Sequence, residues 1–157
     1  MKKIFTLAIL CTSYLGYAQE KPELTLDAYF SAIIVADIDS SINWYSTVLG
    51  FEIQNRVDSE ERGFRQSNLN RNGILLELIQ LDRAVQPKDV LPNFTKKTRM
   101  NGFFKIGFKV SDFEKWIDHL EKSKASFSGN IVSDPLTGKK MIIITDPDGN
   151  RIQIFEK

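Results

Sequence analysis

The chain is poor in the side chains that carry most disulfide, metal and nucleophile chemistry. Its 157 residues include one cysteine, Cys11, and one histidine, His119. A chain with one cysteine cannot form an internal disulfide, so core packing alone must hold the fold together. The sequence also contains no Ser–His–Asp or Cys–His set for nucleophilic catalysis, no His and Cys cluster at metal-ligand spacing, and no glycine-rich phosphate loop.

The chain lacks a hydrophobic run of membrane-spanning length. The apolar run at residues 4–15 falls short of the roughly 20 residues that a spanning helix needs. It follows a basic start, Met1-Lys2-Lys3, and precedes the small residues Gly16 and Ala18, which is the pattern of a secretory signal peptide. We therefore expect residues 1–18 to be removed, together with Cys11, and the mature protein to be exported to the periplasm or secreted.

Neither sign of charge dominates the mature chain. Loss of Lys2 and Lys3 from the 21 basic residues leaves 19, against 20 acidic residues, so the mature net charge is −1. Proteins that bind nucleic acids or anionic membrane surfaces usually carry a basic excess. We therefore expect no nucleic-acid partner, and no membrane association after cleavage of the signal.

An internal repeat is present. With an offset of 75 residues, Val35-Ala36-Asp37-Ile38 aligns with Val110-Ser111-Asp112-Phe113, and with an offset of 76, Asn72-Gly73 aligns with Asp148-Gly149. In each half a strand leads into a helix capped by an Asp, and three strands follow. A duplicated β-α-β-β-β unit of this kind usually builds a cleft between its copies, where a functional site is expected.

Hydrophobic periodicity and turn residues give the expected elements. The strands are expected at residues 29–35, 51–57, 63–69 and 74–81 in the first half and at 103–110, 125–132, 140–145 and 151–155 in the second. The chain is thus divided into a signal peptide (1–18), a lead-in (19–28), a first module (29–81), a linker (82–102) with one short helix near 93–98, and a second module (103–157), with 29–157 together forming one domain.

Two motifs resemble a known superfamily. The first, from Val35 to Phe51, contains Asp37-Ile38, Trp44-Tyr45 and Val48-Leu49-Gly50; the second is Asp146-Pro147-Asp148-Gly149-Asn150 with Ile152 and Ile154. They are similar to the opening strand and helix, and to the final turn and strand, of the vicinal oxygen chelate (VOC) superfamily. This superfamily includes glyoxalase I, bleomycin-resistance proteins, fosfomycin-resistance enzymes and extradiol dioxygenases. The resemblance implies an α+β fold in which two tandem βαβββ modules form a curved mixed sheet around a cleft.

The resemblance also identifies four strand positions that hold a divalent ion in metal-dependent members. Here they are occupied by Phe30, Glu77, Lys105 and Gln153. Phe30 has no ligand atom, Lys105 is cationic and Gln153 is a weak neutral ligand, so only Glu77 suits a metal. We therefore expect no metal and no other cofactor.

The same four positions define the expected ligand site. If they converge, Glu77 and Lys105 form an internal ion pair that fills a lost metal site, or Lys105 binds an anionic or carbonyl-bearing ligand that Glu77 orients. Strand alternation adds Lys109 and Arg151 to the same faces. The expected ligand-binding residues are Phe30, Glu77, Lys105, Lys109, Arg151 and Gln153, with Glu77 and Lys105 as the only catalytic candidates.

Other polar and aromatic residues are weaker candidates for the ligand site. Arg62, Arg65 and Gln66 lie on or beside the third strand, where alternation is poor. Three aromatic residues and the histidine are expected to be structural, the first three in the core and the last on a partly exposed helix flank: Trp44, Tyr45, Trp116 and His119.

These observations favour an exported, metal-independent member of the superfamily that binds a small organic molecule between its modules, as bleomycin-resistance proteins do. One alternative is a glyoxalase- or dioxygenase-type enzyme, a lyase or oxidoreductase, with a rebuilt site. Another is a non-catalytic structural or interaction module whose cleft is filled. The resemblance also allows a homodimer.

Overall fold

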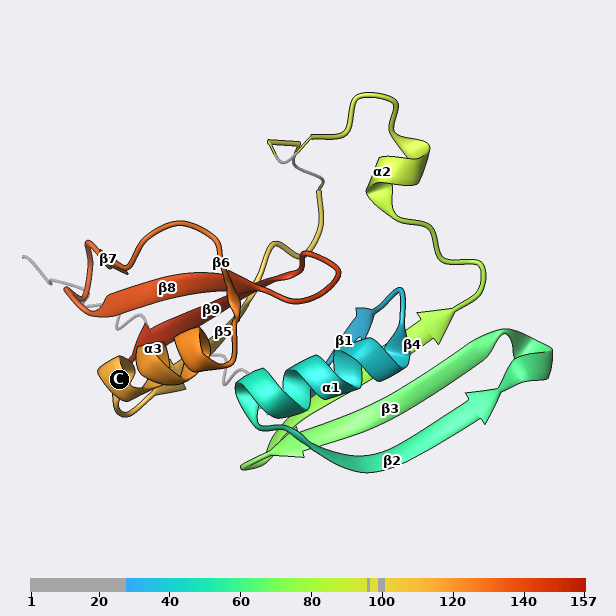
Figure 1. Cartoon of the computed structure of the whole chain (residues 1–157), viewed down its shortest axis with the longest axis horizontal. Helices are drawn as coiled ribbons and strands as arrows, with labels where there is room; N and C mark the ends of the chain where they lie inside the picture. Colours follow the sequence, from blue (N-terminus) through green and yellow to red (C-terminus); the bar gives the residue numbers. More distant parts are fainter. Residues whose placement is uncertain (1–27, 96, 99–100) are drawn as a thin grey trace, which may run out of the picture.

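The computed structural model describes residues 28–95, 97–98 and 101–157. The predicted signal peptide and nearly all of the lead-in lie outside the described residues. The described chain forms two modules that lie side by side, each with its own mixed sheet and one long helix (Figure 1). The predicted fold class, α+β with a duplicated βαβββ unit, is confirmed.

The first module contains a four-stranded sheet in the order β1-β4-β3-β2. Strand β1 is parallel to β4, and the other neighbouring strands are antiparallel. Asn72 and Gly73 join β3 to β4 with positive φ angles of 50° and 83°, the conformation of a tight hairpin turn. The elements are β1 (Phe30–Ile34), α1 (Ile38–Leu49), β2 (Glu52–Ser59), the 3₁₀ helix η1 (Glu60–Arg62), β3 (Phe64–Arg71) and β4 (Ile74–Leu81).

The second module repeats this topology with a five-stranded sheet in the order β5-β9-β8-β6, in which β7 also pairs with β8. Its first and last strands, β5 and β9, are parallel, as β1 and β4 are in the first module. The elements are β5 (Ile106–Val110), α3 (Phe113–Lys122), β6 (Ser126–Phe127), β7 (Val132–Ser133), β8 (Lys140–Thr145) and β9 (Arg151–Glu156).

Both long helices begin at the predicted capping residues. The Asp37 carboxylate accepts a hydrogen bond from the Ser40 amide at 2.7 Å, and the Asp112 carboxylate accepts one from Lys115 at 3.2 Å. Helix α1 ends at Gly50, whose left-handed φ of 64° is typical of a helix terminus. The apolar stripes are buried, with Ile38, Ile42, Tyr45, Val48 and Leu49 on α1 and Phe113, Ile117 and Leu120 on α3.

Three expected elements differ from the structure. Strand β5 begins at Ile106 rather than at residue 103, because it pairs with β9 in the described chain and this pairing starts at Ile106 and Ile152. The expected strand 125–132 is two short strands, β6 and β7, separated by Gly129 with its φ of 100°. The short linker helix is α2 (Pro87–Val90), not residues 93–98, and it begins with the proline that favours a first helical turn.

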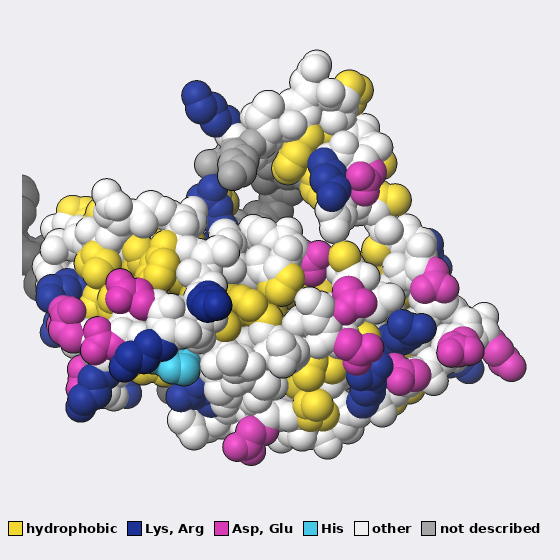
Figure 2. Space-filling model, in the orientation of Figure 1, with side chains coloured by type: hydrophobic (Ala, Val, Ile, Leu, Met, Phe, Trp, Pro, Cys, Tyr) yellow, Lys and Arg dark blue, Asp and Glu magenta, His cyan; other side chains and the backbone are white. Residues whose placement is uncertain are grey.

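The described part of the linker that carries α2 protrudes from the body of the molecule and exposes apolar side chains. Figure 2 shows hydrophobic groups on the projecting segment that carries α2, where Val85, Val90, Leu91 and Phe94 are exposed. On the same view, acidic and basic side chains are interspersed over both modules (Figure 2). Within the described residues, no helix has the length and apolar character needed to cross a bilayer.

A buried polar network joins the two modules. The Tyr45 hydroxyl of α1 donates to Asp146 Oδ2 at 3.0 Å, and Asp146 also accepts from the amides of Asp148 and Asn150 and from the Asn150 side chain. The Asp148 carboxylate accepts in turn from the Ala36 amide at 3.2 Å. Burial, followed by the charge of Asp146, raises the pKa of Tyr45 above its usual range, so the phenol remains a donor. The predicted turn at Asp146 thus also fixes the position of one module on the other.

Candidate ligand-binding site

The first sheet has one covered face and one open face. Helix α1 packs on the face that carries the buried residues Leu69, Leu76 and Leu78. The opposite face, which carries Glu77, is not covered by a helix of the module. A hollow of about 290 Å³ lies on this open face, lined by Tyr29, Phe30, Gln54, Asn55, Asn68, Leu75, Leu76 and Glu77.

Sheet register assembles the centre of this hollow. Glu77 lies on β4 directly between Ala32 of β1 and Asn68 of β3. Its Oε1 accepts a hydrogen bond from Gln66 Nε2, and the same amide nitrogen lies 3.2 Å from Asn68 Oδ1. The amide contact orients a half-buried carboxylate and leaves it further acceptor capacity for a ligand.

The hollow has a distinctive electrostatic character. Three carboxamides, those of Gln54, Asn55 and Asn68, accompany the one carboxylate, and no Lys or Arg lines the hollow in the described part of the chain. Tyr29 and Phe30 provide aromatic surface at one side, in edge-to-face contact at 5.4 Å. Donors, acceptors and apolar surface therefore meet around a single negative charge.

The structure brings together two of the four residues that the superfamily pattern places in one site. Phe30 and Glu77 line the same hollow. Lys105 lies just before β5 in the second module, where it is exposed, and no ion pair joins it to Glu77 among the described residues. The internal ion pair, one of the two arrangements expected if the four positions converge, is therefore absent among the described residues: Lys105 is exposed beside β5, whereas Glu77 is half-buried on the open face of the first sheet.

Gln153 and its neighbours form a different environment. Gln153 is 6% exposed on β9, and its amide nitrogen contacts the Met141 sulfur, a weak acceptor. Arg151 stacks its guanidinium 4.8 Å from the centre of the Phe104 ring. These side chains pack against their own module, and neither of them lines the hollow around Glu77.

Gln66 and Lys109 have surroundings that differ from those expected from the sequence. Gln66, which poor alternation had placed low, is the hydrogen-bond donor to Glu77. The available signal was its spacing of two from Asn68, the residue that pairs with Glu77 across the hairpin. Lys109 does not reach the Glu77 hollow; it lines a separate pocket between the modules.

The donor set does not fit the divalent metal of metal-dependent superfamily members. Of the four expected positions, Glu77 alone offers an anionic ligand, while Gln153 is held against Met141 and Lys105 is cationic. No group of three or more His, Cys, Asp or Glu side chains is arranged to hold a metal ion in the part of the chain that the structure describes.

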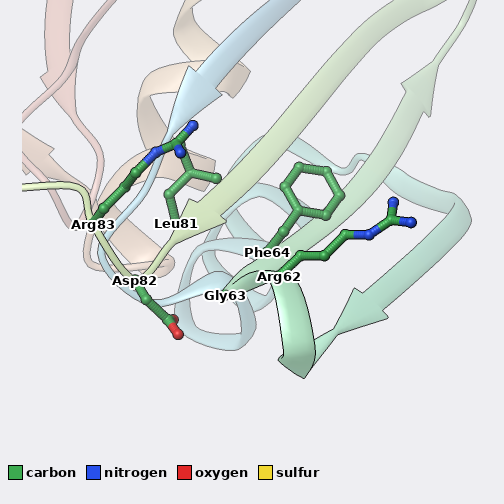
Figure 3. A pocket seen from close by; sticks show the side chains of 6 residues that line it. All are labelled: Arg62, Gly63, Phe64, Leu81, Asp82 and Arg83. Atoms are coloured by element: carbon green, nitrogen blue, oxygen red, sulfur yellow. The ribbon is translucent and has the colours of Figure 1, made fainter.

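A larger hollow, of about 430 Å³, lies at the far end of the same sheet, where Phe64 and Leu81 are paired. Figure 3 shows the side chains of Arg62 and Arg83 extending on either side of it, and the Asp82 carboxylate pointing away from both. All three charged residues are exposed, so water already hydrates their charged groups. We consider this hollow less suited to specific recognition than the one around Glu77.

The chain is similar to known proteins over most of its length. The family model for the Glyoxalase/Bleomycin resistance protein/Dioxygenase superfamily matches residues 26–154. The uncharacterized protein YwkD of Bacillus subtilis (strain 168) is 29% identical over 126 residues, which cover 80% of this chain and 93% of that protein. The uncharacterized protein YaeR of Escherichia coli (strain K12) is 28% identical over 127 residues, covering 80% and 92%.

Solved structures show the same fold. A glyoxalase family protein from Enterococcus faecalis superposes with a TM-score of 0.71 at 24% identity, covering 83% of this chain and 97% of that chain. The trypanothione-dependent glyoxalase I of Leishmania major superposes with a TM-score of 0.63 at 20% identity, covering 84% and 87%. At these identities the structural likeness concerns the arrangement of the backbone.

Proposed function

Because the chain belongs to the Glyoxalase/Bleomycin resistance protein/Dioxygenase superfamily, we propose that it binds a small organic molecule in the hollow around Glu77. The single observation that supports this proposal best is the half-buried Glu77 carboxylate, oriented by Gln66 and surrounded by carboxamides and aromatic surface. Binding pockets commonly combine apolar walls with a few fixed polar groups in this way.

The charges of the hollow favour a cationic ligand. One carboxylate without a lining Lys or Arg attracts an ammonium group and repels an anion. The carboxamides of Gln54, Asn55 and Asn68 add hydrogen-bonding partners for hydroxyl or amide groups, and Phe30 offers a ring face. We therefore replace the expectation of an anionic ligand, which depended on Lys105, by that of a small amine with an apolar part.

Binding without catalysis and without a metal is the form of the proposal that the residues favour. General acid–base catalysis usually needs a proton donor and a proton acceptor on either side of the reacting group. Apart from Glu77, the one titratable residue that lines the hollow, among those described, is the exposed phenol of Tyr29. Export of the mature protein remains part of the proposal and depends on the N-terminal sequence pattern.

A homodimer completes the proposal. Ile34 and Val57 are 56% and 53% exposed and do not line the hollow, and strand register places both on the face that carries Glu77. An exposed apolar face of this kind is typical of a protein–protein contact. Light scattering should give twice the mass of the mature chain for wild type, and the mass of a single chain for Ile34→Glu. A wild-type protein that is monomeric at tens of micromolar would contradict the proposed homodimer.

The binding proposal is tested with benzylammonium as the probe. Calorimetry should detect saturable binding, and Glu77→Gln should weaken it about tenfold or more, as expected for a lost charge-assisted contact. Glu121→Gln is the matched control, because Glu121 is exposed on the flank of α3 and makes the same change of charge. Equal weakening by both variants, or none by Glu77→Gln, would refute the assignment of the site.

Metal content is measured on the same preparation. Elemental analysis of protein purified without chelators should find less than one divalent ion per ten chains. A stoichiometric divalent ion that survives dialysis would overturn the metal-independent form of the proposal and favour a rebuilt enzyme site.

A further inference from the structure

A second pocket lies between the modules, away from the open sheet face. It has a volume of about 260 Å³ and is formed by the end of α1, the β3–β4 turn, β5 and α3. Phe51, Phe108 and Ile154 supply apolar surface from both modules, and the Phe51 and Phe108 ring centres are 6.0 Å apart. The pocket is therefore a feature of the module interface rather than of either module alone.

The charges that line this pocket have the opposite sign to those of the Glu77 hollow. Arg71, Lys109 and Lys157 contribute three cations, and no Asp or Glu side chain lines the pocket in the described chain. Arg71 is the cation whose side chain has contacts at the pocket wall, with the Leu49 carbonyl and the Trp116 ring. Lys109 lines the pocket from β5, the edge strand of its sheet, where its exposed side chain alternates with the inward-facing Phe108 and Val110.

Arg71 is held in place before any ligand arrives. One of its terminal nitrogens donates a hydrogen bond to the Leu49 carbonyl, and its guanidinium lies 4.9 Å from the centre of the Trp116 ring. A guanidinium has five N–H donors, so this single hydrogen bond leaves most of them available. A fixed arginine beside an indole ring is suited to an anion that also has a flat apolar part, because the side chain loses little entropy on binding.

From these observations we propose that the inter-module pocket is a second ligand site, which binds a small aromatic carboxylate. The Arg71 guanidinium faces the carboxylate, the long Lys109 side chain reaches it around the edge of β5, and Trp116, Phe51 and Phe108 contact the ring. The volume lies just below the roughly 300 Å³ at which pockets for drug-sized ligands begin, so a single ring is the expected size. Since both modules form the walls, ligand binding also stabilises their packing.

The test uses three single-ring ligands of similar size: benzoate, its planar neutral isostere benzamide, and the cation benzylammonium. The chain has two tryptophans, and Trp44→Phe identifies the indole N–H signal of Trp116 in a ¹⁵N–¹H correlation spectrum. Benzoate should shift the Trp116 signal in a saturable manner, whereas benzamide should bind at least fivefold more weakly and benzylammonium should leave the signal unchanged, as charge-assisted contacts predict.

Lys109→Met should weaken benzoate binding about fivefold, and Lys122→Met, which removes an exposed lysine of α3 that does not line the pocket, should leave it unchanged. An equal response to benzoate and benzylammonium, or equal affinities of Lys109→Met and wild type, would overturn the proposal. Because Trp116 reports only on this pocket, the outcome is independent of whether Glu77 binds an amine.

Discussion

Replacing Tyr45 by phenylalanine removes the hydroxyl that joins α1 of the first module to the closing turn of the second. Tyr45 is 1% exposed, and its hydroxyl donates to the buried Asp146 carboxylate at 3.0 Å. Hydrogen bonds to charged groups contribute about 1.5–3 kcal/mol to stability. Asp146 keeps three other donors, so the expected loss is at the lower end, about 1.5–2 kcal/mol in the free energy of unfolding.

The ring of Tyr45 is unchanged in this variant, so its edge-to-face contacts with Trp44 and Phe51 at 4.9 and 6.2 Å remain. Urea unfolding followed by circular dichroism measures the change, and a loss of this size lowers the Tm by roughly 5 °C in a domain of this length. Tyr29→Phe is the control, because Tyr29 is 74% exposed. A Tyr45→Phe variant within 0.5 kcal/mol of wild type would refute the idea that the hydroxyl links the modules.

Three further predictions concern charge, backbone and processing. Burial, with nearby carboxylates, raises the pKa of Asp148, so the folded state favours the protonated carboxyl. The contribution of this carboxyl to the free energy of unfolding is fully present below its unfolded pKa and is lost as the pH rises through its folded pKa. Asp148→Asn should therefore stabilise the protein at pH 7 by less than about 1 kcal/mol, with the gain shrinking toward pH 3, as urea unfolding at both pH values would show. Gly50→Ala should destabilise more than Gly73→Ala, since both need positive φ but only the Cβ at position 50 would lie 2.5 Å from Arg71; equal losses of Tm would contradict this. Mass spectrometry of the exported protein should give a chain that begins at residue 19 and has no thiol that reacts with Ellman's reagent; a mass that includes residues 1–18 would refute cleavage.

Local signals in the sequence predicted the scaffold well. The helix caps at Asp37 and Asp112, the apolar stripe of α1 and the Asn72-Gly73 turn depend on neighbouring residues, and all are present in the structure. Strand lengths were less predictable, because a strand extends only as far as its partner. Residues 103–105 have the composition of a strand, but β9 offers them no pairing, and Lys105 consequently lies outside β5.

The candidate site was only half predictable from the sequence, for a similar reason. Glu77 and Phe30 share a face of one sheet, and alternation is sufficient to bring them together. The distance between Glu77 and Lys105 depends on how the modules pack, and here they pack through Tyr45 with Asp146 and through the aromatic contact near Phe108 rather than through their open sheet faces. Packing of this kind depends on contacts between residues far apart in the sequence, which no periodicity records.

Opposite charges distinguish the two proposed sites more sharply than their positions do. The Glu77 hollow contains a carboxylate and no lining cation, while the inter-module pocket contains Arg71 and Lys109 and no lining carboxylate side chain, in each case among the described residues. A ligand that fits one site is therefore repelled by the other, since the Coulomb term changes sign while the aromatic surface is similar in kind. Each of two variants is therefore measured with both probes. Glu77→Gln should weaken the binding of benzylammonium alone, and Lys109→Met should weaken the binding of benzoate alone. If either variant weakened both ligands to the same extent, the two hollows would not be separate sites, and electrostatic selection would not be what divides them.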